Sequence, residues 1–332
     1  MQKNNKQTSG KTWGMGGSSK QFKVSKIPSS NINQRGRPEI LDKKFSKKAV
    51  DKSSNNIIPK KSLGQNFLTN ADICEKIVAL PNLIEGDLVC EIGPGQMALT
   101  NFLLQKTQNL IIIEKDIECY NLVLAHFTAS NYVVRLQEAF VCATKNNQNI
   151  LLLNADALQI DVQNIIATFN ASFNTSFKEL KIVANLPYNI ATLLVYKWCE
   201  LDLPFLQSLT IMIQKEVAER ITAKTNTKSY GKLSVLCQLL FACKMAFDVS
   251  AANFYPAPKV TSSLIVMQKN ADSILKFDNV IPFAKFLTIA FAKKRKTLSN
   301  VFKGTNININ PSLAQKRIED LHPTQILQMF VG

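Results

Sequence analysis

The segment Asn185-Leu186-Pro187-Tyr188 carries groups suited to chemistry on a flat, amine-bearing base. It follows the apolar run 182–184, so it is expected at the exposed end of a buried strand. The Asn185 side chain offers a carbonyl acceptor, and the main chain of Leu186 offers a second. Pro187 fixes its own φ and biases Leu186 towards an extended backbone, which holds the acceptors still. The ring of Tyr188 gives a face on which a base can stack. A strand followed by a turn with a packing tyrosine is the alternative.

A glycine turn between a strand and a helix predicts a nucleotide-binding βα unit. Residues 87–92 form an apolar strand, Gly93 and Gly95 flank a proline, and residues 97–106 have helical spacing. Glycines let a ligand approach the backbone closely, and a helix N-terminus supplies free N–H groups. The pattern is the short Glu-x-Gly-x-Gly form rather than Gly-x-Gly-x-x-Gly. It therefore favours a small nucleoside-bearing cofactor over a dinucleotide.

Acidic residues end the next two predicted strands. Glu114 follows the apolar residues 109–113, where an acid about 20 residues past the glycine turn grips a ribose diol in such folds. A helix-capping acid is the alternative for Glu114. Asp156 ends the strand that starts at residue 150, and it is placed to accept from the exocyclic amine of an adenine. Because ligands of open α/β sheets lie outside the carboxyl ends of the strands, these acids and Asn185 are expected at one edge.

Two further segments could complete this pocket. Gln65 and Asn66 come just before the helix that begins near Asn70, where polar side chains could line a pocket, although a polar loop before a helix is ordinary. Phe254 lies in a proline-stiffened joint between predicted strands at 246–249 and 262–267. That joint is either a packed hairpin loop or a second wall for a stacked base.

The remaining pattern predicts an α/β domain followed by helices. Residues 117–149 are expected to form a helix and then an Asn-rich connection, and residues 168–179 are polar and of low complexity. The further predicted elements are a strand at 208–214 and helices at 190–200, 215–221, 235–240 and 283–291. The sheet is expected to end near residue 270. This divides the chain into a main domain over 56–270 and a small helical domain over 271–332.

Basic residues are concentrated at the two ends of the chain. Of a formal charge of +16, residues 1–61 contribute 15 Lys/Arg against 3 Asp/Glu, and residues 277–332 contribute 8 against 3. The body between them holds 17 against 18 and is nearly neutral. Basic ends on a neutral body fit a polyanionic partner. Residues 1–55 are polar and lack periodicity, so they are predicted to be a disordered basic arm or a solubilising tail.

A run of four cations, Lys293, Lys294, Arg295 and Lys296, follows the predicted helix 283–291. It is expected within a helix, where such a run is often only a solvated surface. Beside the neutral body we favour contact with nucleic-acid phosphates.

Composition argues against several classes of protein. No stretch approaches the roughly 18 apolar residues of a membrane span, and the N-terminus lacks the apolar region of a secretory signal. Its basic, acid-poor character leaves organellar import open. The 7 cysteines contain no CxxC pair and predict free thiols in a reducing compartment. His126 and His322 are far apart, so neither a metal site nor a histidine base is expected.

Taken together, the motifs resemble the KsgA-type ribosomal RNA adenine dimethyltransferases. The matching segments come in that family's order over about residues 60–300, and seven in order are highly specific. They are Gly64-Gln65-Asn66-Phe67-Leu68, Glu91-Ile92-Gly93-Pro94-Gly95, Glu114-Lys115-Asp116, Asn154-Ala155-Asp156-Ala157-Leu158, Asn185-Leu186-Pro187-Tyr188, the segment 214–220 and the segment 254–260.

The resemblance implies a Rossmann-like class I S-adenosylmethionine-dependent methyltransferase with a small C-terminal helical domain. It implies dimethylation of the 6-amino groups of two adjacent adenosines near the 3′ end of small-subunit rRNA. By position, Asn66 and Leu68 would contact the methionine part of the cofactor, and Gly93 would belong to the turn that approaches it. Glu114 would contact the ribose and Asp156 the adenine. Asn185 and the Leu186 carbonyl would hold the target amine, with Tyr188 and Phe254 around its ring. We expect a cytoplasmic monomer in a bacterial cell.

Some features depart from the family, and three other functions stay open. The basic tail and the long connection at 126–150 exceed the usual core, and Gln96-Met97 and Ala257 replace the residues usual there. The alternatives are methylation of a large-subunit rRNA adenine, a non-enzymatic nucleic-acid-binding factor on the same fold, and a small-molecule methyltransferase. Intact Glu114, Asp156 and Asn185 argue against lost chemistry, and the basic ends argue against a small-molecule substrate.

Overall fold

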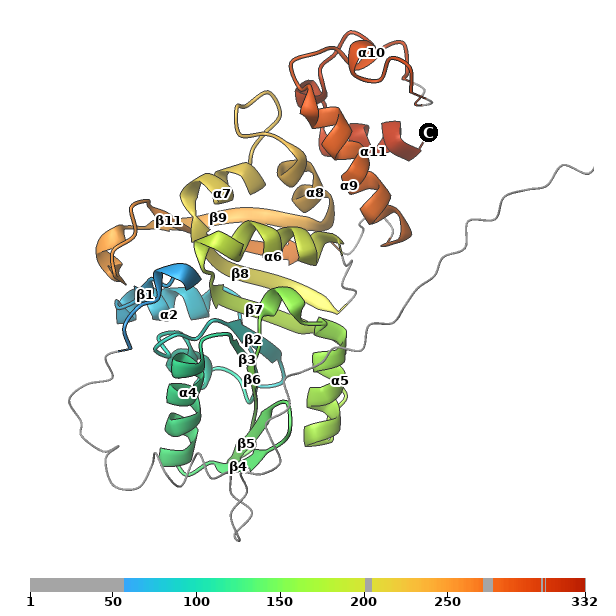
Figure 1. Ribbon diagram of the computed structural model, residues 1–332. Coiled ribbons are helices and arrows are strands. Elements are labelled where there is room, and N and C mark those ends of the chain that lie inside the picture. The colour runs from blue at the N-terminus through green and yellow to red at the C-terminus, as the bar shows by residue number, and fades with distance from the viewer. Residues whose placement is uncertain (1–56, 201–204, 271–276, 306, 308, 332) are drawn as a thin grey trace, which may run out of the picture. The chain divides into compact units, whose positions relative to one another are not determined.

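A computed structural model describes residues 57–200, 205–270, 277–305, 307 and 309–331 (Figure 1). These residues belong to one compact unit. The predicted basic tail lies outside the described residues. Within the described part, no helix is long and apolar enough to cross a bilayer.

The described residues form a nine-stranded sheet in the order β4-β5-β6-β3-β2-β7-β8-β11-β9. Its parallel centre consists of β6 (Gln148–Asn154), β3 (Asn109–Glu114), β2 (Leu88–Ile92), β7 (Leu180–Asn185) and β8 (Leu206–Gln214). Antiparallel strands flank it: β11 (Ser262–Lys269) and β9 (Phe241–Val249) on one side, β5 (Val141–Lys145) and β4 (Val133–Leu136) on the other. The chain leaves β2 towards β3 and returns on the other side at β7. This reversal creates a ligand crevice at the carboxyl ends of β2 and β7, and it confirms the predicted Rossmann-like class.

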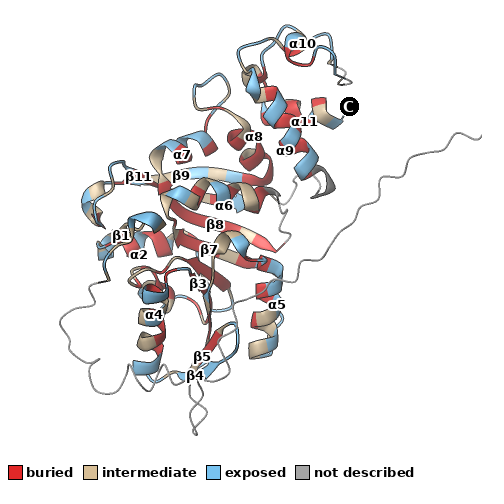
Figure 2. Ribbon diagram, viewed as in Figure 1, coloured by how far each residue is buried: buried red, intermediate tan, exposed pale blue. Residues whose placement is uncertain are grey.

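Both faces of the central strands are buried, as Figure 2 shows by their red colour. Successive side chains of a strand point to opposite faces. In β2, Cys90 therefore packs in one hydrophobic cluster and Val89 in a second. In β3, Ile111 and Ile112 divide in the same way. Parallel strands buried on both faces need near-continuous apolar sequences, which is why these strands could be recognised from the sequence.

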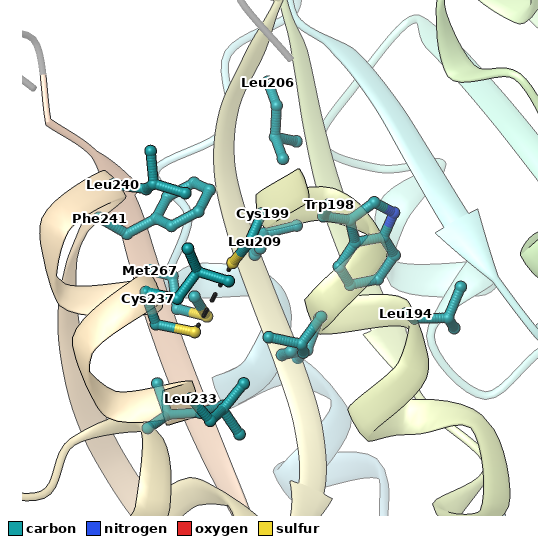
Figure 3. Packing of buried hydrophobic residues seen from close by; sticks show 14 of the residues in the cluster. Leu194, Trp198, Cys199, Leu206, Leu209, Leu233, Cys237, Leu240, Phe241 and Met267 are labelled. Atoms are coloured by element: carbon teal, nitrogen blue, oxygen red, sulfur yellow. Dashed lines mark hydrogen bonds between the residues drawn. The ribbon is translucent and has the colours of Figure 1, made fainter. Parts of the chain in front are cut away.

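Helices cover the two faces as two layers, and α4 and α5 lie on opposite sides of the sheet in Figure 1. The first cluster receives apolar side chains from α5 (Val162–Phe173), α6 (Tyr188–Glu200), α7 (Lys215–Ile221) and α8 (Lys232–Leu240). The second receives them from α2 (Ala71–Ala79), α3 (Thr100–Leu103) and α4 (Ile117–Ala129). Figure 3 shows the packing between α6 and α8, where Cys199 and Cys237 face each other with their sulfurs 3.7 Å apart. All seven cysteines are free thiols, as the sequence predicts.

The structure differs from the sequence prediction in three elements. The helix expected over 97–106 is only α3, because Met97 has a φ of 67° and helical geometry starts at Thr100. The expected connection before residue 150 contains the hairpin β4–β5, which extends the sheet at its edge. The segment 168–179, expected to be polar and of low complexity, contains the second half of α5, whose Phe169 and Phe173 pack in the first cluster. The polar Asn170 and Asn174 in this segment form the end of the helix: Asn170 hydrogen-bonds to Phe177, and Asn174 is the C-cap.

After β11 the chain forms helices α9 (Phe277–Ala292), α10 (Leu298–Val301) and α11 (Pro323–Val331), with the turn η4 (Ile318–Asp320). Helix α9 contacts α6 and α8, and α11 contacts α8. The buried hydroxyl of Tyr230 donates to the Leu321 carbonyl over 2.9 Å. The change from strands to helices lies where the sequence predicts it, after Lys269. A separate domain over 271–332 stays a prediction.

Candidate active site

A cleft lies at the carboxyl ends of β2, β3, β6 and β7, with about 1070 Å³ of empty volume including its open mouth. Its lining comes from residues 62–68, 91–96, 98–99, 113–115, 155–157 and 185–190. All the strand-end residues singled out from the sequence therefore meet at one edge of the sheet. This follows from the parallel arrangement, which brings the carboxyl ends of neighbouring strands together.

Glu114 ends β3 and faces this cleft with a fixed carboxylate. One oxygen, Oε1, accepts from the Asp116 N–H over 2.7 Å, and Oε2 accepts from the Gly95 N–H over 3.3 Å. The residue is only 6% exposed. Burial raises the pKa of Glu114, although the two backbone N–H groups oppose this. The carboxylate is thus held by the glycine turn itself, in the position predicted for a ribose-binding acid.

The glycine turn approaches the N-terminal segment very closely. Gly95 has a φ of 54°, and a Cβ atom there would lie 2.8 Å from the ring of Phe67. Gly93 also has a positive φ, 69°. Backbone of this kind strains any residue with a side chain. The turn therefore needs glycine at both positions for its conformation, and at Gly95 also because the ring of Phe67 leaves no room for a side chain.

Asp156 follows β6 and caps the short turn η2 (Ala157–Gln159). Its Oδ1 accepts from the Leu158 N–H over 2.9 Å, and its Oδ2 pairs with Lys115 Nζ over 2.8 Å. Burial opposes ionisation, but the contact with Lys115 and the Leu158 N–H together lower the pKa of Asp156. The side chain stays ionised and lines the cleft beside the end of β3.

Asn185 ends β7, and its amide is oriented by the N-terminal segment. Its Nδ2 donates to the Asn66 carbonyl over 3.2 Å. The main chain of the next residue, Leu186, donates to the Met212 carbonyl over 3.1 Å, which extends the pairing of β7 with β8. Asn185, Leu186 and Pro187 all line the cleft.

The two predicted aromatic residues have different environments. Tyr188 lines the cleft, and its hydroxyl lies 2.5 Å from Ser262 Oγ. Phe254 is 5% exposed and packs in the second cluster, in the short strand β10 (Phe254–Tyr255) that pairs with β1 (Phe67–Leu68). It is absent from the cleft lining. The ring of Phe254 is therefore packed in the protein and does not face the cleft where a target base is expected. Its neighbour Tyr255 is 63% exposed.

The residues before the first helix are largely committed to contacts within the protein. Gln65 Nε2 donates to Asp116 Oδ2 over 2.7 Å, and Gln65 Oε1 accepts from the Lys60 N–H over 2.7 Å. Asn66 Nδ2 donates to the Gly64 carbonyl over 3.2 Å. Leu68 is 5% exposed and packs in the second cluster. All of Gln65, Asn66 and Leu68 line the cleft.

Glu91 is a site residue that the sequence did not lead us to predict. This acid is 1% exposed at the base of the cleft, and its Oε2 has no hydrogen-bond partner among the described residues. Burial raises the pKa of Glu91 to about 8. An acid inside the apolar run Val89-Cys90-Glu91-Ile92 was the signal that could have found it, because an ionisable side chain in a buried strand needs a functional reason.

The four cations of the predicted phosphate site are not on a helix, in contrast to the prediction. Helix α9 ends at Ala292, and residues 293–296 form a turn in which the Lys296 N–H donates to the Lys293 carbonyl over 2.8 Å. Lys293, Arg295 and Lys296 are exposed. Lys294 is half-buried, and its ammonium pairs with Glu319, 3.3 Å away, and donates to the Lys228 carbonyl. A helix would spread consecutive cations around its circumference, whereas the turn projects three of them to solvent.

Among the residues that the structure describes, no group of three or more His, Cys, Asp or Glu side chains could hold a metal ion.

Comparisons with known proteins match this geometry. The family model described as ribosomal RNA adenine dimethylase matches residues 57–331. A protein of Ureaplasma parvum serovar 3 named ribosomal RNA small subunit methyltransferase A is 36% identical over 299 residues, 87% of this chain and 98% of that protein. The protein of the same name from Wolbachia pipientis wMel is 40% identical over 244 residues, 73% of this chain and 75% of that protein.

Solved structures support the fold. A crystal structure of a dimethyladenosine transferase from Plasmodium falciparum has a TM-score of 0.63 at 23% identity, covering 80% of this chain and 96% of that one. The 23S rRNA methyltransferase ErmE has a TM-score of 0.55 at 19% identity, with 80% and 98% covered. The family model spans all of the described residues and includes the whole cleft. The chain therefore belongs to the ribosomal RNA adenine dimethylase family.

Proposed function

We propose that the protein transfers methyl groups from S-adenosylmethionine to the 6-amino groups of two adjacent adenosines near the 3′ end of small-subunit (16S) rRNA, during ribosome assembly. The observation that carries the proposal is the meeting of Glu114, Asp156 and Asn185 in one cleft of a chain in this family. A large-subunit substrate is not favoured, because relatives at 36% and 40% identity are named ribosomal RNA small subunit methyltransferase A. A monomer in the cytoplasm is the simplest setting for this activity.

The cleft suits the cofactor chemically. Glu91 presents a buried carboxylate oxygen without a partner among the described residues, as a ligand with an ammonium group requires. At Gly93, no heavy atom of the described residues, its chain neighbours aside, lies within 4 Å of where a Cβ atom would be, so the turn leaves open space at this position beside the cleft. Glu114 would hold the ribose diol, and Asp156 would accept from the adenine amine. Asn66 and Leu68 would cover the methionine part.

The chemistry of transfer requires an activated amine. When bound, S-adenosylmethionine supplies a methyl group on a positively charged sulfur. An adenine amine is a poor nucleophile because its lone pair is delocalised into the ring. The Asn185 Oδ1 and the Leu186 carbonyl would accept hydrogen bonds from the N–H groups of this amine. These contacts would orient the amine and stabilise the positive charge that develops on its nitrogen. After transfer the nitrogen is acidic, so its proton can pass to water without a strong base.

The target base must leave its stack to reach the cleft, which costs a few kcal/mol unless it is already unpaired. Tyr188 would offset part of that cost, since stacking on an aromatic side chain contributes about 1–3 kcal/mol per base. The hydrogen bond between its hydroxyl and Ser262 supports this role by limiting rotation of the ring.

The test is methylation of small subunits isolated from cells that lack this modification. The protein is incubated with these subunits and methyl-labelled cofactor, and the labelled bases are mapped. We expect dimethylation of two adjacent adenosines near the 3′ end and none in large subunits. If only large-subunit rRNA were labelled, the substrate would be the large subunit instead of the small one. If neither were labelled, the protein would be a nucleic-acid-binding factor without catalytic activity.

A further inference from the structure

The N-terminal segment Lys60–Leu68, which we call the strap, closes one side of the cleft. Seven of its residues, 62–68, line the cleft. Figure 1 shows β1, at the end of the strap, beside α2. The strap is tied down at its far end by β1, whose residues Phe67 and Leu68 pair with β10. It also approaches α6 tightly, because a Cβ atom on Gly64 would lie 2.9 Å from Asn189 Oδ1.

The buried carboxylate of Asp116 holds the near end of the strap, where Lys60 also pairs with the exposed Glu118 over 3.2 Å. Asp116 Oδ1 accepts from Lys60 Nζ over 2.6 Å, and its Oδ2 accepts from Gln65 Nε2 over 2.7 Å. The Asp116 side chain is 1% exposed. Burial disfavours its charge, but the hydrogen bonds from Lys60 and Gln65 outweigh this and lower the pKa of Asp116. Hydrogen bonds to an ionised acceptor in a water-poor site are stronger than neutral ones.

The strap is in turn the group that orients Asn185. A backbone carbonyl cannot donate, so the Asn66 carbonyl can only receive the Nδ2 end of the Asn185 amide. This contact fixes which end of the amide faces the strap, and it leaves Oδ1 as the end available to an amine in the cleft. Without the strap, the amide could turn and present its N–H groups to an amine that needs an acceptor.

Asp116 also connects the strap to the predicted ribose site. Its backbone N–H donates to Glu114 Oε1 over 2.7 Å, and its side chain receives Gln65 from the strap. Glu114 and Asp116, two positions apart, are therefore hydrogen-bonded to each other, with Glu114 at the predicted ribose site and Asp116 in contact with the strap.

We propose that Asp116 is a positioning residue for methyl transfer: it latches the strap, and through the Asn66 carbonyl the strap sets the amide of Asn185. The inference rests on the proposed function, in which Asn185 receives the target amine. The competing explanation is that Asp116 only caps α4, since it also accepts from the Glu118 N–H over 3.1 Å.

Asp116→Asn separates these explanations. Asparagine caps a helix as well as aspartate does, so the cap is retained. The new side chain, however, has an amide nitrogen in place of one oxygen. With Oδ1 kept on the Glu118 N–H, that nitrogen takes the place of Oδ2 and faces the donating Gln65 Nε2. We expect kcat on unmethylated small subunits to fall by about tenfold, and the dissociation constant of S-adenosylhomocysteine to rise by about tenfold, as for removal of one charge-assisted hydrogen bond.

A reciprocal exchange tests the contact directly. Gln65→Glu alone places a second carboxylate against Asp116 and should release the strap. Combined with Asp116→Asn, it restores one donor and one acceptor with the polarity reversed and with the same total charge. We expect the double variant to recover most of the kcat and affinity that each single variant loses. Recovery of this kind cannot arise from helix capping, to which Gln65 makes no contribution.

The matched control is Asp87→Asn. Asp87 pairs with Lys181 over 2.7 Å and accepts from the Ile84 N–H, at the opposite ends of the strands and outside the cleft lining. It should lower the unfolding temperature without changing kcat or cofactor affinity. If Asp116→Asn behaves like this control, Asp116 does not position the strap and only caps α4.

Failure of the unaltered protein to methylate small subunits would overturn the proposed function instead. The cofactor affinity of Asp116→Asn, measured without RNA, would still decide whether Asp116 holds the strap in place.

Discussion

At the scale of single residues, the cleft divides its tasks between charged and neutral acceptors. The carboxylates of Glu91, Glu114 and Asp156 lie on β2, β3 and the end of β6, where the cofactor is expected. The neutral amide of Asn185 lies on β7, where the target amine is expected. A neutral acceptor orients an amine without taking its proton before transfer, whereas carboxylates suit the diol and ammonium of the cofactor. Substitutions at these positions should therefore affect transfer and cofactor binding separately.

Replacement of Asn185 by alanine should abolish most of the transfer. Removal of one preorganised group that stabilises a transition state typically costs about 10²–10³ in kcat. Its contact with the Asn66 carbonyl is a neutral hydrogen bond worth about 0.5–1.5 kcal/mol, so affinity for S-adenosylhomocysteine should fall by less than about tenfold. Single-turnover rates on small subunits and calorimetry measure the two effects. Near-normal turnover would remove Asn185 from the mechanism.

Glu114→Gln should weaken cofactor binding through the ribose. The carboxylate is expected to accept two hydroxyl donors, and hydrogen bonds to a charged group contribute about 1.5–3 kcal/mol. The decisive comparison uses S-adenosylhomocysteine and its 2′-deoxy analogue. The analogue should bind more weakly than the natural ligand to the unaltered protein and about equally to the variant. A discrimination that survives in the variant would show that Glu114 acts only through the glycine turn.

Glu91→Gln should change how the stability of the cofactor-free protein depends on pH. The pKa of Glu91 is raised from 4.5 to about 8, because burial penalises its charged form. The folded state therefore keeps a proton that the unfolded chain releases above about pH 4.5. The protonated Glu91 therefore adds to the free energy of unfolding at low pH, and this contribution is lost as pH rises through about 8. The variant should gain stability relative to the unaltered protein between pH 5 and pH 8 in thermal unfolding. A constant difference across that range would mean that Glu91 ionises normally.

At the scale of elements, the sequence predicts best what is fixed by burial. The strands β2, β3 and β7 are apolar on both faces, and their carboxyl ends could be identified from the polar residues that follow. The same reasoning brought Glu114, Asp156 and Asn185 together, because a parallel sheet leaves few other places for them. Gly93 and Gly95 were recognisable because only a turn with positive φ needs them there.

Other elements depend on contacts that a local pattern does not contain. Strand β4 has a mostly exposed surface, so its alternation is weak and it is held mainly by pairing with β5. Gln65 lines the cleft as predicted, but nothing in the sequence indicated that its amide also donates to Asp116, a residue 51 positions away. Phe254 is similarly drawn into the core by its pairing with Leu68. Long-range pairing of this kind is visible only once the chain is folded.

At the scale of the whole molecule, a cleft alone does not select a ribosomal substrate, because it holds one base at a time. Selection requires binding of the surrounding phosphates, which is electrostatic and sensitive to salt. Two groups of cations can supply it: the exposed residues Lys293, Arg295 and Lys296 in the turn after α9, and the basic segment 1–55. The turn is part of a folded surface, so it binds without first having to be ordered. The composition of residues 1–55 predicts a disordered segment. A segment of that kind loses part of its attraction to the conformational entropy of ordering on RNA.

The folded turn should therefore dominate RNA binding. Changing Lys293, Arg295 and Lys296 to Gln should weaken rRNA binding and flatten its dependence on salt, by about 0.7–0.9 in log–log slope for each phosphate that is no longer neutralised. Lys294→Gln is the matched control: its ammonium pairs with Glu319, so the slope should hardly change.

Deletion of residues 1–55 should reduce affinity for rRNA less than the triple change does, and cofactor affinity should stay constant in all three variants. The measurement is rRNA binding at several salt concentrations. An unaltered slope in the triple variant, with a large reduction in affinity on deletion, would make the N-terminal segment the anchor on RNA and the turn an ordinary solvated surface.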